Sequence, residues 1–409
     1  VYPKNIIGGV ITFVLLMCAT QTFAQQNESD TTETDQFIGT YQDYAFVRAG
    51  DFSRSISIPG VPGSFRLGGF AQLNANFDID NNGFQQIGTP PTIPLNGDPE
   101  DGENQFAMHA RFTTFNFDYR STTKVGDLRI FIEFDMFGNV GNEFNNDYGV
   151  RLRHAGVELG NWRFGQYHSG LTDFFSTPET ADPGTPANTV VLRQPSIYYM
   201  RGGHQGSNWG IGIENPTSDL SGNTNLIRSE AMPHIVAFGR LERDWGYMRL
   251  AGIFLQLRST TEEVYTGGAH LSGQINMPFI REKDNVKFGI QAGEGFVHYF
   301  SSFVGGLDGV ILDDGQIEST GLFGVHVSYQ HWWSKILRSS FVFSSFELDA
   351  PELIDPLSYS GGERYTANLF WSPIESATFG WEVNYQTIET ADGSEGEGLR
   401  IEMVSRFTF

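Results

Sequence analysis

The chain has 409 residues, 26 of them basic and 48 acidic, and its formal net charge is −22. So acidic a chain argues against a nucleic-acid partner, because phosphate binding needs a basic surface. Aromatic residues reach 14% and glycines number 48, while hydrophobic residues make up only 39% of the chain. This balance leaves little material for one large dry core and disfavours an ordinary cytosolic enzyme.

The first 24 residues have the pattern of a secretory signal peptide. Lys4 precedes an apolar stretch over residues 6–19, and the segment ends at Ala24. The apolar stretch is shorter than the roughly 20 residues that a spanning helix needs. We therefore predict cleavage near Ala24. Cleavage there would also remove the one cysteine, Cys18, and with it any disulfide or thiolate chemistry.

Residues 25–64 show no strand pattern. Their polar beginning, residues 25–36, is low in hydrophobicity and predicts disorder. The proline and glycine residues at 59–63 predict a turn that leads into the first strand. We therefore expect a partly disordered periplasmic segment at this end of the chain.

From residue 65 onward the dominant pattern is alternation of apolar and polar residues. The odd positions from Phe65 to Phe77 are mostly apolar or small, while the even positions include Arg66 and Gln72. Such runs are about 10 to 13 residues long, which suits tilted strands that cross a bilayer in about 9 to 11 residues. Residues 65–409 are therefore predicted to form an all-β fold, a transmembrane antiparallel β-barrel. The alternative, a soluble sandwich, would have a thin core because the opposite face is rich in glycine and polar residues.

Sixteen such segments can be placed, beginning near residues 65, 105, 127, 150, 162, 192, 208, 234, 246, 267, 286, 320, 336, 363, 376 and 398. Long connections (80–104, 139–149, 169–191, 215–233, 258–266, 299–319, 349–362 and 389–397) alternate with short ones. Long outer loops and short periplasmic turns are typical of the bacterial outer membrane. A change of parity near Thr113 and the short segments at 162 and 208 leave fourteen or eighteen strands open.

A closed sheet of this size is too wide for side chains to fill, so water is expected inside it. Arginines dominate the basic residues and are predicted to face this lumen. The predicted pore-lining residues are Arg66, Arg111, Arg129, Arg151, Arg153, Arg163, Arg193 and Arg400, and parity also directs Arg249, Arg364 and Arg406 inward. They would attract anions and hold a carboxylate in transit. Alternatively, they pair with Glu133, Asp135, Glu158, Glu382 and Glu402 to brace the barrel wall.

The connection over residues 169–191 contains three prolines, and a connection of this length is rarely without a structural or functional role. We expect it either to fold into the lumen and narrow it or to form a surface cap.

Several short stretches together carry a resemblance to a known family. They are Gly50–Ser55 with Ile58–Gly60, the strand GGFAQLNANFD, QFAMHAR from Gln105, FIEF from Phe131, Arg151–Ala155, Gly165-Gln166, Arg193–Pro195, WSPIESATFGWEVNYQ, Asp392-Gly393, Leu399–Ile401 and the terminal Phe409. Over about residues 50–409 the chain resembles the DcaP-like trimeric outer-membrane porins. The resemblance implies a homotrimer in the lipid bilayer that passes small anionic solutes, with dicarboxylates as the namesake substrates. The chain lacks the N-terminal heptad pattern of many members.

The terminal Phe409, preceded by Met403 and Phe407, looks like the signal by which outer-membrane barrels are recognised by the assembly machinery. An ordinary final strand is the alternative.

Two other functions compete with a pore. One is an outer-membrane enzyme, for which Ser169 beside His168, or His154 near Glu158, could be catalytic, but no known catalytic or metal-ligand spacing accompanies them. The other is a barrel with a blocked lumen that serves adhesion or structure. We predict no catalytic residue, no cofactor and no metal site, and we expect a channel for passive diffusion.

Overall fold

The computed structural model describes residues 48–79, 93–99, 101–138, 148–202, 206–300, 307–351 and 359–409. The predicted signal peptide, residues 1–24, and residues 25–47 of the predicted N-terminal segment lie outside these ranges. Within the described residues, no helix is long and apolar enough to cross a membrane.

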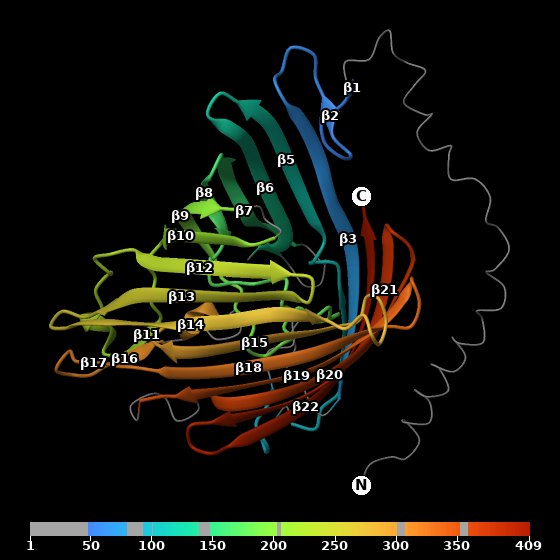
Figure 1. Ribbon diagram of the computed structural model, residues 1–409. Helices are drawn as coiled ribbons and strands as arrows, with labels where there is room; N and C mark the ends of the chain where they lie inside the picture. The colour runs from blue at the N-terminus through green and yellow to red at the C-terminus, as the bar shows by residue number, and fades with distance from the viewer. Residues whose placement is uncertain are drawn as a thin grey trace, which may run out of the picture. The chain divides into compact units, whose positions relative to one another are not determined.

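The main unit of the chain is a closed antiparallel barrel of sixteen strands, in which each strand pairs with the next one along the sheet (Figure 1). The last strand, β22, pairs with the first, β3, from Leu399 opposite Ile79 to Thr408 opposite Phe70. The strands are β3 (Ser64–Ile79), β4 (Gln105–His109) with β5 (Thr114–Thr123), β6 (Gly126–Gly138), β7 (Gly149–Leu159), β8 (Trp162–His168), β9 (Arg193–Arg201), β10 (Asn208–Glu214), β12 (His234–Arg243), β13 (Gly246–Arg258), β14 (Glu263–Asn276), β15 (Asn285–Glu294), β18 (Gly321–Trp332), β19 (Leu337–Asp349), β20 (Tyr359–Ile374), β21 (Ala377–Thr390) and β22 (Glu395–Thr408). Closure leaves no unpaired sheet edge, which is what a strand-built wall in hydrocarbon requires.

The second barrel strand is interrupted at residues 110–113, where the sequence shows the change of parity that left the strand number open. β4 pairs with the C-terminal half of β3, and β5 pairs with its N-terminal half. Next to the interruption, Gly69 of β3 lies opposite Phe115 of β5, and its φ of 150° and close approach to β5 leave no room for a side chain. A Cβ atom there would lie 2.1 Å from the carbonyl oxygen of Thr114. The glycine therefore allows β3 and β5 to approach each other closely beside the interruption.

The predicted strand number is confirmed, and most strands begin within one residue of the predicted position. Two predicted long connections are wrong. β13 and β14 extend to Arg258 and Glu263, and β21 and β22 to Thr390 and Glu395, so four-residue turns join them. These hairpins continue because their ends are stabilised locally, in the first by an ion pair of 3.0 Å between Arg258 Nε and Glu263 Oε1.

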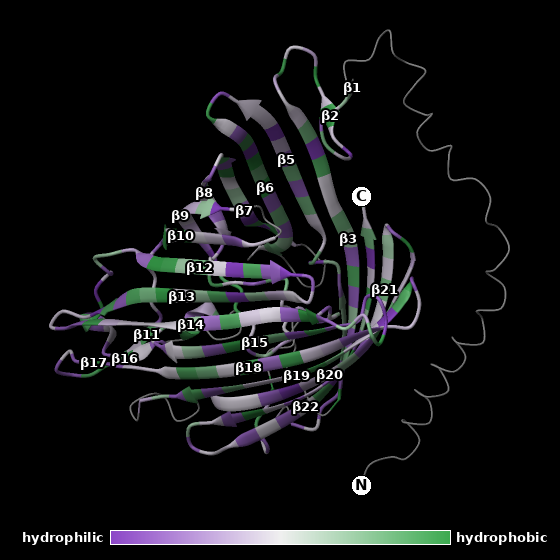
Figure 2. Cartoon of the chain, in the orientation of Figure 1, coloured by the Kyte–Doolittle hydropathy of each residue, from purple (hydrophilic) through white to green (hydrophobic). Residues whose placement is uncertain are grey.

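The two faces of the barrel wall differ in polarity, and bands of opposite hydropathy alternate along the strands in Figure 2. On β22 the outward Met403 and Phe407 are exposed, whereas the inward Arg400 and Glu402 are buried. Exposed apolar side chains and buried polar ones invert the arrangement of a soluble protein. This is the pattern of a barrel whose outer face meets lipid.

One part of the interior is apolar, contrary to the expectation of water throughout. Inward side chains of β12 and β13 pack against residues from the segments 215–233, 295–300 and 307–320. The packed set includes Val236, Ile253, Leu255, Leu257, Leu220, Val297, Phe300, Val310 and Ile311. Because these connections fold inward, their apolar side chains can leave water, and the inward strand positions beside them are apolar too.

The remaining short elements are β1 (Arg48–Ala49), β2 (Ile56–Ser57), β11 (Leu220–Gly222), η5 (Thr224–Leu226), η6 (Val297–Tyr299), β16 (Gly309–Ile311) and β17 (Ile317–Ser319). β11, β16 and β17 form a separate three-stranded sheet between the two inward-folded connections.

Candidate functional site

Residues 169–192, here called the inserted loop, lie inside the barrel against the inward side chains of β13 to β22. Its backbone carbonyl groups accept hydrogen bonds along its length. The donors are Arg249 to Gly170 and Leu171, His270 to Leu171, His326 to Ser176, Lys287 to Thr177 and Asn368 to Glu179. Its backbone N–H groups donate in turn, from Ala181 and Asp182 to Glu382 and from Ala187 to Ser344. Of the two courses left open for this connection, the structure shows the one into the lumen.

Asp182 makes the most buried side-chain attachment of the inserted loop. Its carboxylate lies 2.8 Å from Arg364 Nη2 and 3.4 Å from Arg400 Nη1. Arg400 also binds Asp78 on β3 with two hydrogen bonds, of 2.6 and 3.0 Å. Burial alone would raise the pKa of Asp182, but the charges of Arg364 and Arg400 more than offset it and hold this pKa below its ordinary value. The loop is thus fixed to the wall by an ionised carboxylate.

Two further acidic side chains hold the same loop. Glu179 binds Arg338 on β19 in a bidentate ion pair. Asp173 accepts hydrogen bonds from Tyr247, at 3.0 Å, and from Ser272, at 2.7 Å. Acidic side chains therefore anchor the loop at three positions along its length.

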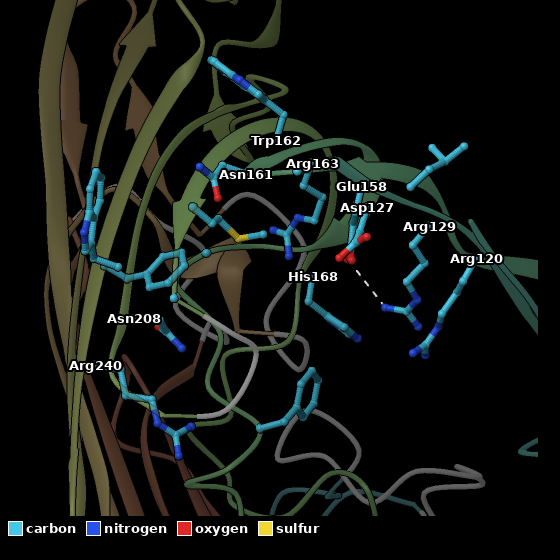
Figure 3. Close-up of a pocket in the computed structure, with 18 of the residues that line it drawn as sticks. Arg120, Asp127, Arg129, Glu158, Asn161, Trp162, Arg163, His168, Asn208 and Arg240 are labelled. Atoms are coloured by element: carbon cyan, nitrogen blue, oxygen red, sulfur yellow. Dashed lines mark ion pairs between the residues drawn. The ribbon is translucent and has the colours of Figure 1, made fainter. Parts of the chain in front are cut away.

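A cavity of about 880 Å³ opens at the end of the barrel where the short turns lie. Figure 3 shows Arg120, Arg129, Arg163, Arg240 and His168 around this space. Its full lining contains these four arginines and Arg249, against the four acidic residues Asp51, Asp127, Glu158 and Asp173. Its size is in the range of small-molecule sites, and its wall carries one more cation than anion before histidine is counted.

Three arginines of this region share one carboxylate. Asp118 on β5 is fully buried and lies 3.3 Å from Arg66, 2.8 Å from Arg120 and 3.0 Å from Arg129. Arg129 also lies 3.6 Å from Glu158, the pair marked in Figure 3. Three guanidinium groups therefore meet two carboxylates, and part of their positive charge faces the cavity.

Arg163 and Arg193 form no ion pair with an acidic residue among the described residues. Arg163 on β8 stacks over the rings of Tyr167 and Tyr198, at 4.9 and 4.8 Å from the ring centroids. Arg193 on β9 lies opposite His168 in the sheet. The Nε atom of each arginine is buried without a hydrogen-bond partner. Neither guanidinium charge is therefore neutralised by an ion pair within the described residues.

The arginines of β7 are paired instead. Arg151 binds Asp135 with hydrogen bonds of 2.9 and 2.6 Å, and Arg153 lies 2.8 Å from both Glu133 and Asp135. Arg111, in the interruption between β4 and β5, donates to the carbonyl oxygen of Met136. These residues lie near the long-loop end, since β7 begins there.

The predicted residues therefore fall into three places. Arg66, Arg129 and Arg163 lie together near the cavity, Arg151, Arg153, Arg193 and Arg111 lie further towards the long loops, and Arg400 is buried beneath the inserted loop. Sequence reasoning missed Arg120 and Arg240. Both occupy even, inward positions, of β5 and β12 respectively. Arg120 could have been found once the parity of β5 was counted from Thr114.

The residues considered for an enzyme have other neighbours. The ring of His168 lies against those of His154 and Phe174, at centroid distances of 4.7 and 4.4 Å. The hydroxyl oxygen of Ser169 accepts a hydrogen bond from the N–H of Leu171. Within the described residues, no group of acidic, histidine or cysteine side chains has the geometry to hold a metal ion.

The terminal Phe409 follows β22 at the short-turn end. Its ring is half exposed and lies 5.8 Å from that of Phe115, and its N–H donates to Gly69 at 3.1 Å.

A closed sixteen-stranded barrel with an apolar outer face, a polar inner wall and a loop folded into its lumen has the architecture of an outer-membrane porin. The family model described as DcaP outer membrane protein matches residues 63–409. The chain therefore belongs to the DcaP outer membrane protein family, and this family and the barrel fold indicate the bacterial outer membrane.

Solved structures show the same fold. The outer membrane channel DcaP of Acinetobacter baumannii aligns with a TM-score of 0.73 at 17% identity, over 85% of this chain and 98% of that one. An anion-selective porin from Comamonas acidovorans aligns with a TM-score of 0.56 at 11% identity, over 85% of this chain and 100% of that one. The trimer form of OmpT of Vibrio cholerae aligns with a TM-score of 0.52 at 10% identity, over 85% of this chain and 100% of that one. The comparison with curated proteins finds no match.

Proposed function

We propose that this chain forms a water-filled channel for the passive diffusion of small anionic solutes, with dicarboxylate-like molecules as the preferred class. The observation that carries the proposal is the arginine wall of the cavity, in which Arg163 has no acidic partner among the described residues. Guanidinium groups bind carboxylates in a planar, bidentate manner, so several of them along one wall favour a solute with more than one carboxylate. The anion-selective porin among the structural neighbours and the membership of the DcaP family support the same class of cargo.

Planar-bilayer recordings of the purified protein test this proposal. Under a KCl gradient, we expect a reversal potential that reports chloride as the more permeant ion. Replacing Arg120, Arg129 and Arg163 together by glutamine should lower the ratio of chloride to potassium permeability. The matched control is Arg228→Gln, since Arg228 is exposed in a long connection away from the cavity. A wild-type channel that prefers potassium would refute the proposal.

A barrel with a blocked lumen is the second candidate. The apolar packing of residues 295–300 and 307–320 inside the barrel favours it, because this packing fills part of the long-loop end. The same recordings decide between the two, since a pore gives stepwise currents and a blocked barrel gives none.

We further propose that the chain assembles as a homotrimer after removal of residues 1–24, and that Phe409 is read by the assembly machinery. The trimer form among the structural neighbours supports the first part. Mass determination of the detergent complex by light scattering tests it, and a monomer as the sole species would contradict it.

A further inference from the structure

Residues Gly50–Ser55 form a tight turn at the short-turn end of the barrel. Gly50 N donates to Ser55 O at 2.9 Å, and Phe52 N donates to Ser55 Oγ at 3.1 Å. The turn is also bound to the first residue of β3, because Asp51 N donates to Ser64 Oγ and this hydroxyl donates to Asp51 Oδ2, each at 2.9 Å. Gly50 is required at this contact, since a Cβ atom there would lie 2.8 Å from that of Ser64. The turn therefore holds a fixed place beside the barrel wall.

The turn carries Phe52 to the arginines around Asp118. The guanidinium carbon of Arg120 lies 4.5 Å from the centroid of the Phe52 ring, and that of Arg66 lies 5.8 Å from it. Phe52, Asp51 and Arg120 all line the cavity. One aromatic ring thus contacts two of the three cations that share a single carboxylate.

The carboxylate of Asp118 faces more hydrogen-bond donors than it has acceptor sites. Asp118 accepts hydrogen bonds from Arg66 Nη2, from Nε and Nη2 of Arg120 and from Nε and Nη2 of Arg129. Two carboxylate oxygens offer about four lone-pair sites, and the three guanidinium groups repel one another. The negative face of an aromatic ring attracts a cation, so Phe52 offsets part of this repulsion for two of them.

We propose that Phe52 is a positioning residue for anion selectivity. It holds Arg66 and Arg120 at the periplasmic mouth of the channel, where their charge faces the solute. Without the ring, the half-exposed side chain of Arg120 has freedom to leave the mouth for bulk water. This inference rests on the proposed function, because it assigns part of the proposed anion preference to one side chain outside the barrel strands.

The test compares Phe52→Leu with Phe52→Tyr. Leucine keeps an apolar side chain and removes the ring, whereas tyrosine keeps the ring face. The control is Phe279→Leu, because Phe279 is 78% exposed in the connection 277–284 at the same end of the barrel. The readout is the ratio of chloride to potassium permeability, from reversal potentials at low ionic strength, where charges are least screened. Retention of β-sheet circular dichroism in detergent establishes that each variant is folded.

We expect Phe52→Leu to lower this ratio by about two- to fivefold, the effect of one exposed cation–π contact, and Phe52→Tyr and Phe279→Leu to leave it unchanged. An unchanged ratio in Phe52→Leu overturns the inference, and an equal fall in Phe52→Tyr also does so, because the ring would then act by shape alone. A wild-type channel that prefers potassium overturns the proposed function. In that case the positioning role still requires Phe52→Leu, and not Phe52→Tyr, to shift the ratio further towards potassium.

Discussion

Asp182 and Arg364 form an ion pair of 2.8 Å inside the barrel, and their side chains are 0% and 1% exposed. Asp182 belongs to the inserted loop and Arg364 to β20, so the pair joins the inserted loop to the barrel wall. Few contacts in the described chain combine such burial with such separation in sequence.

Replacing Asp182 by asparagine should loosen the inserted loop. The change leaves Arg364 as a buried charge without this partner, and breaking a buried pair costs about 3–5 kcal/mol. We expect a lower temperature of thermal unfolding and larger current noise in the open channel. Glu395→Gln is the matched control, since Glu395 is exposed in the last hairpin. Wild-type noise and stability in Asp182→Asn would show that the backbone hydrogen bonds alone hold the loop.

The same residue predicts a pH dependence. The pKa of Asp182 lies below its ordinary value in the folded protein. Its contribution to stability is therefore fully present above the unfolded pKa of about 3.9 and is lost as the pH falls through the lower folded pKa. We expect constant channel noise from pH 8 to pH 5 and a rise only below about pH 4. Because other carboxyl groups also titrate there, the measurement is the difference between the wild type and Asp182→Asn. A difference that already changes near pH 6 would contradict the expectation.

Replacing Arg151 and Arg153 together by glutamine should reduce anion preference more than Arg163→Gln does. The double change leaves Asp135 and Glu133 without these partners in the lumen wall, whereas Arg163 forms no ion pair within the described part of the chain. One unit charge at 4 Å in water is worth about 1 kcal/mol, or about fivefold in the permeability ratio. Reversal potentials measure the effect. Equal ratios in the double variant and the wild type would move the selective region away from β7.

Phe409→Ala should separate assembly from folding. The side chain is half exposed, and its backbone N–H bond to Gly69 persists in the variant, so we expect refolding in detergent with wild-type thermal stability. If Phe409 is the assembly signal, the amount of protein in the outer membrane falls in cells. A matched loss of refolding would instead identify an ordinary structural residue.

The period-two pattern of the sequence predicted the barrel well, because lipid outside and water inside impose opposite requirements on neighbouring residues. The strand number, most strand starts and the irregularity near Thr113 followed from this pattern. The tight hairpins at 259–262 and 391–394 did not, since alternation fades once a strand leaves the membrane and pairing alone extends it.

The site could be predicted only in part. Parity indicates that a side chain such as Arg400 points inward, but it cannot reveal that Asp182, more than 200 residues away in the sequence, will cover it. Nor can parity show that Phe52 lies beside Arg120, because that contact comes from an irregular turn. Inward direction and access to solute are different properties, and only the path of the inserted loop separates them.

Apart from the side chains of Asp173, Glu179 and Asp182, the inserted loop is held mainly through its peptide groups, which every residue type except proline supplies in full. Residues such as Phe174 and Phe175, whose side chains are about half exposed, can therefore be exchanged without altering the course of the chain. The positions that tolerate least change are these three acidic residues and the positions of the surrounding strands that provide donors and acceptors. A channel built in this way can change the cargo that it admits by point substitutions along the loop while its scaffold stays constant.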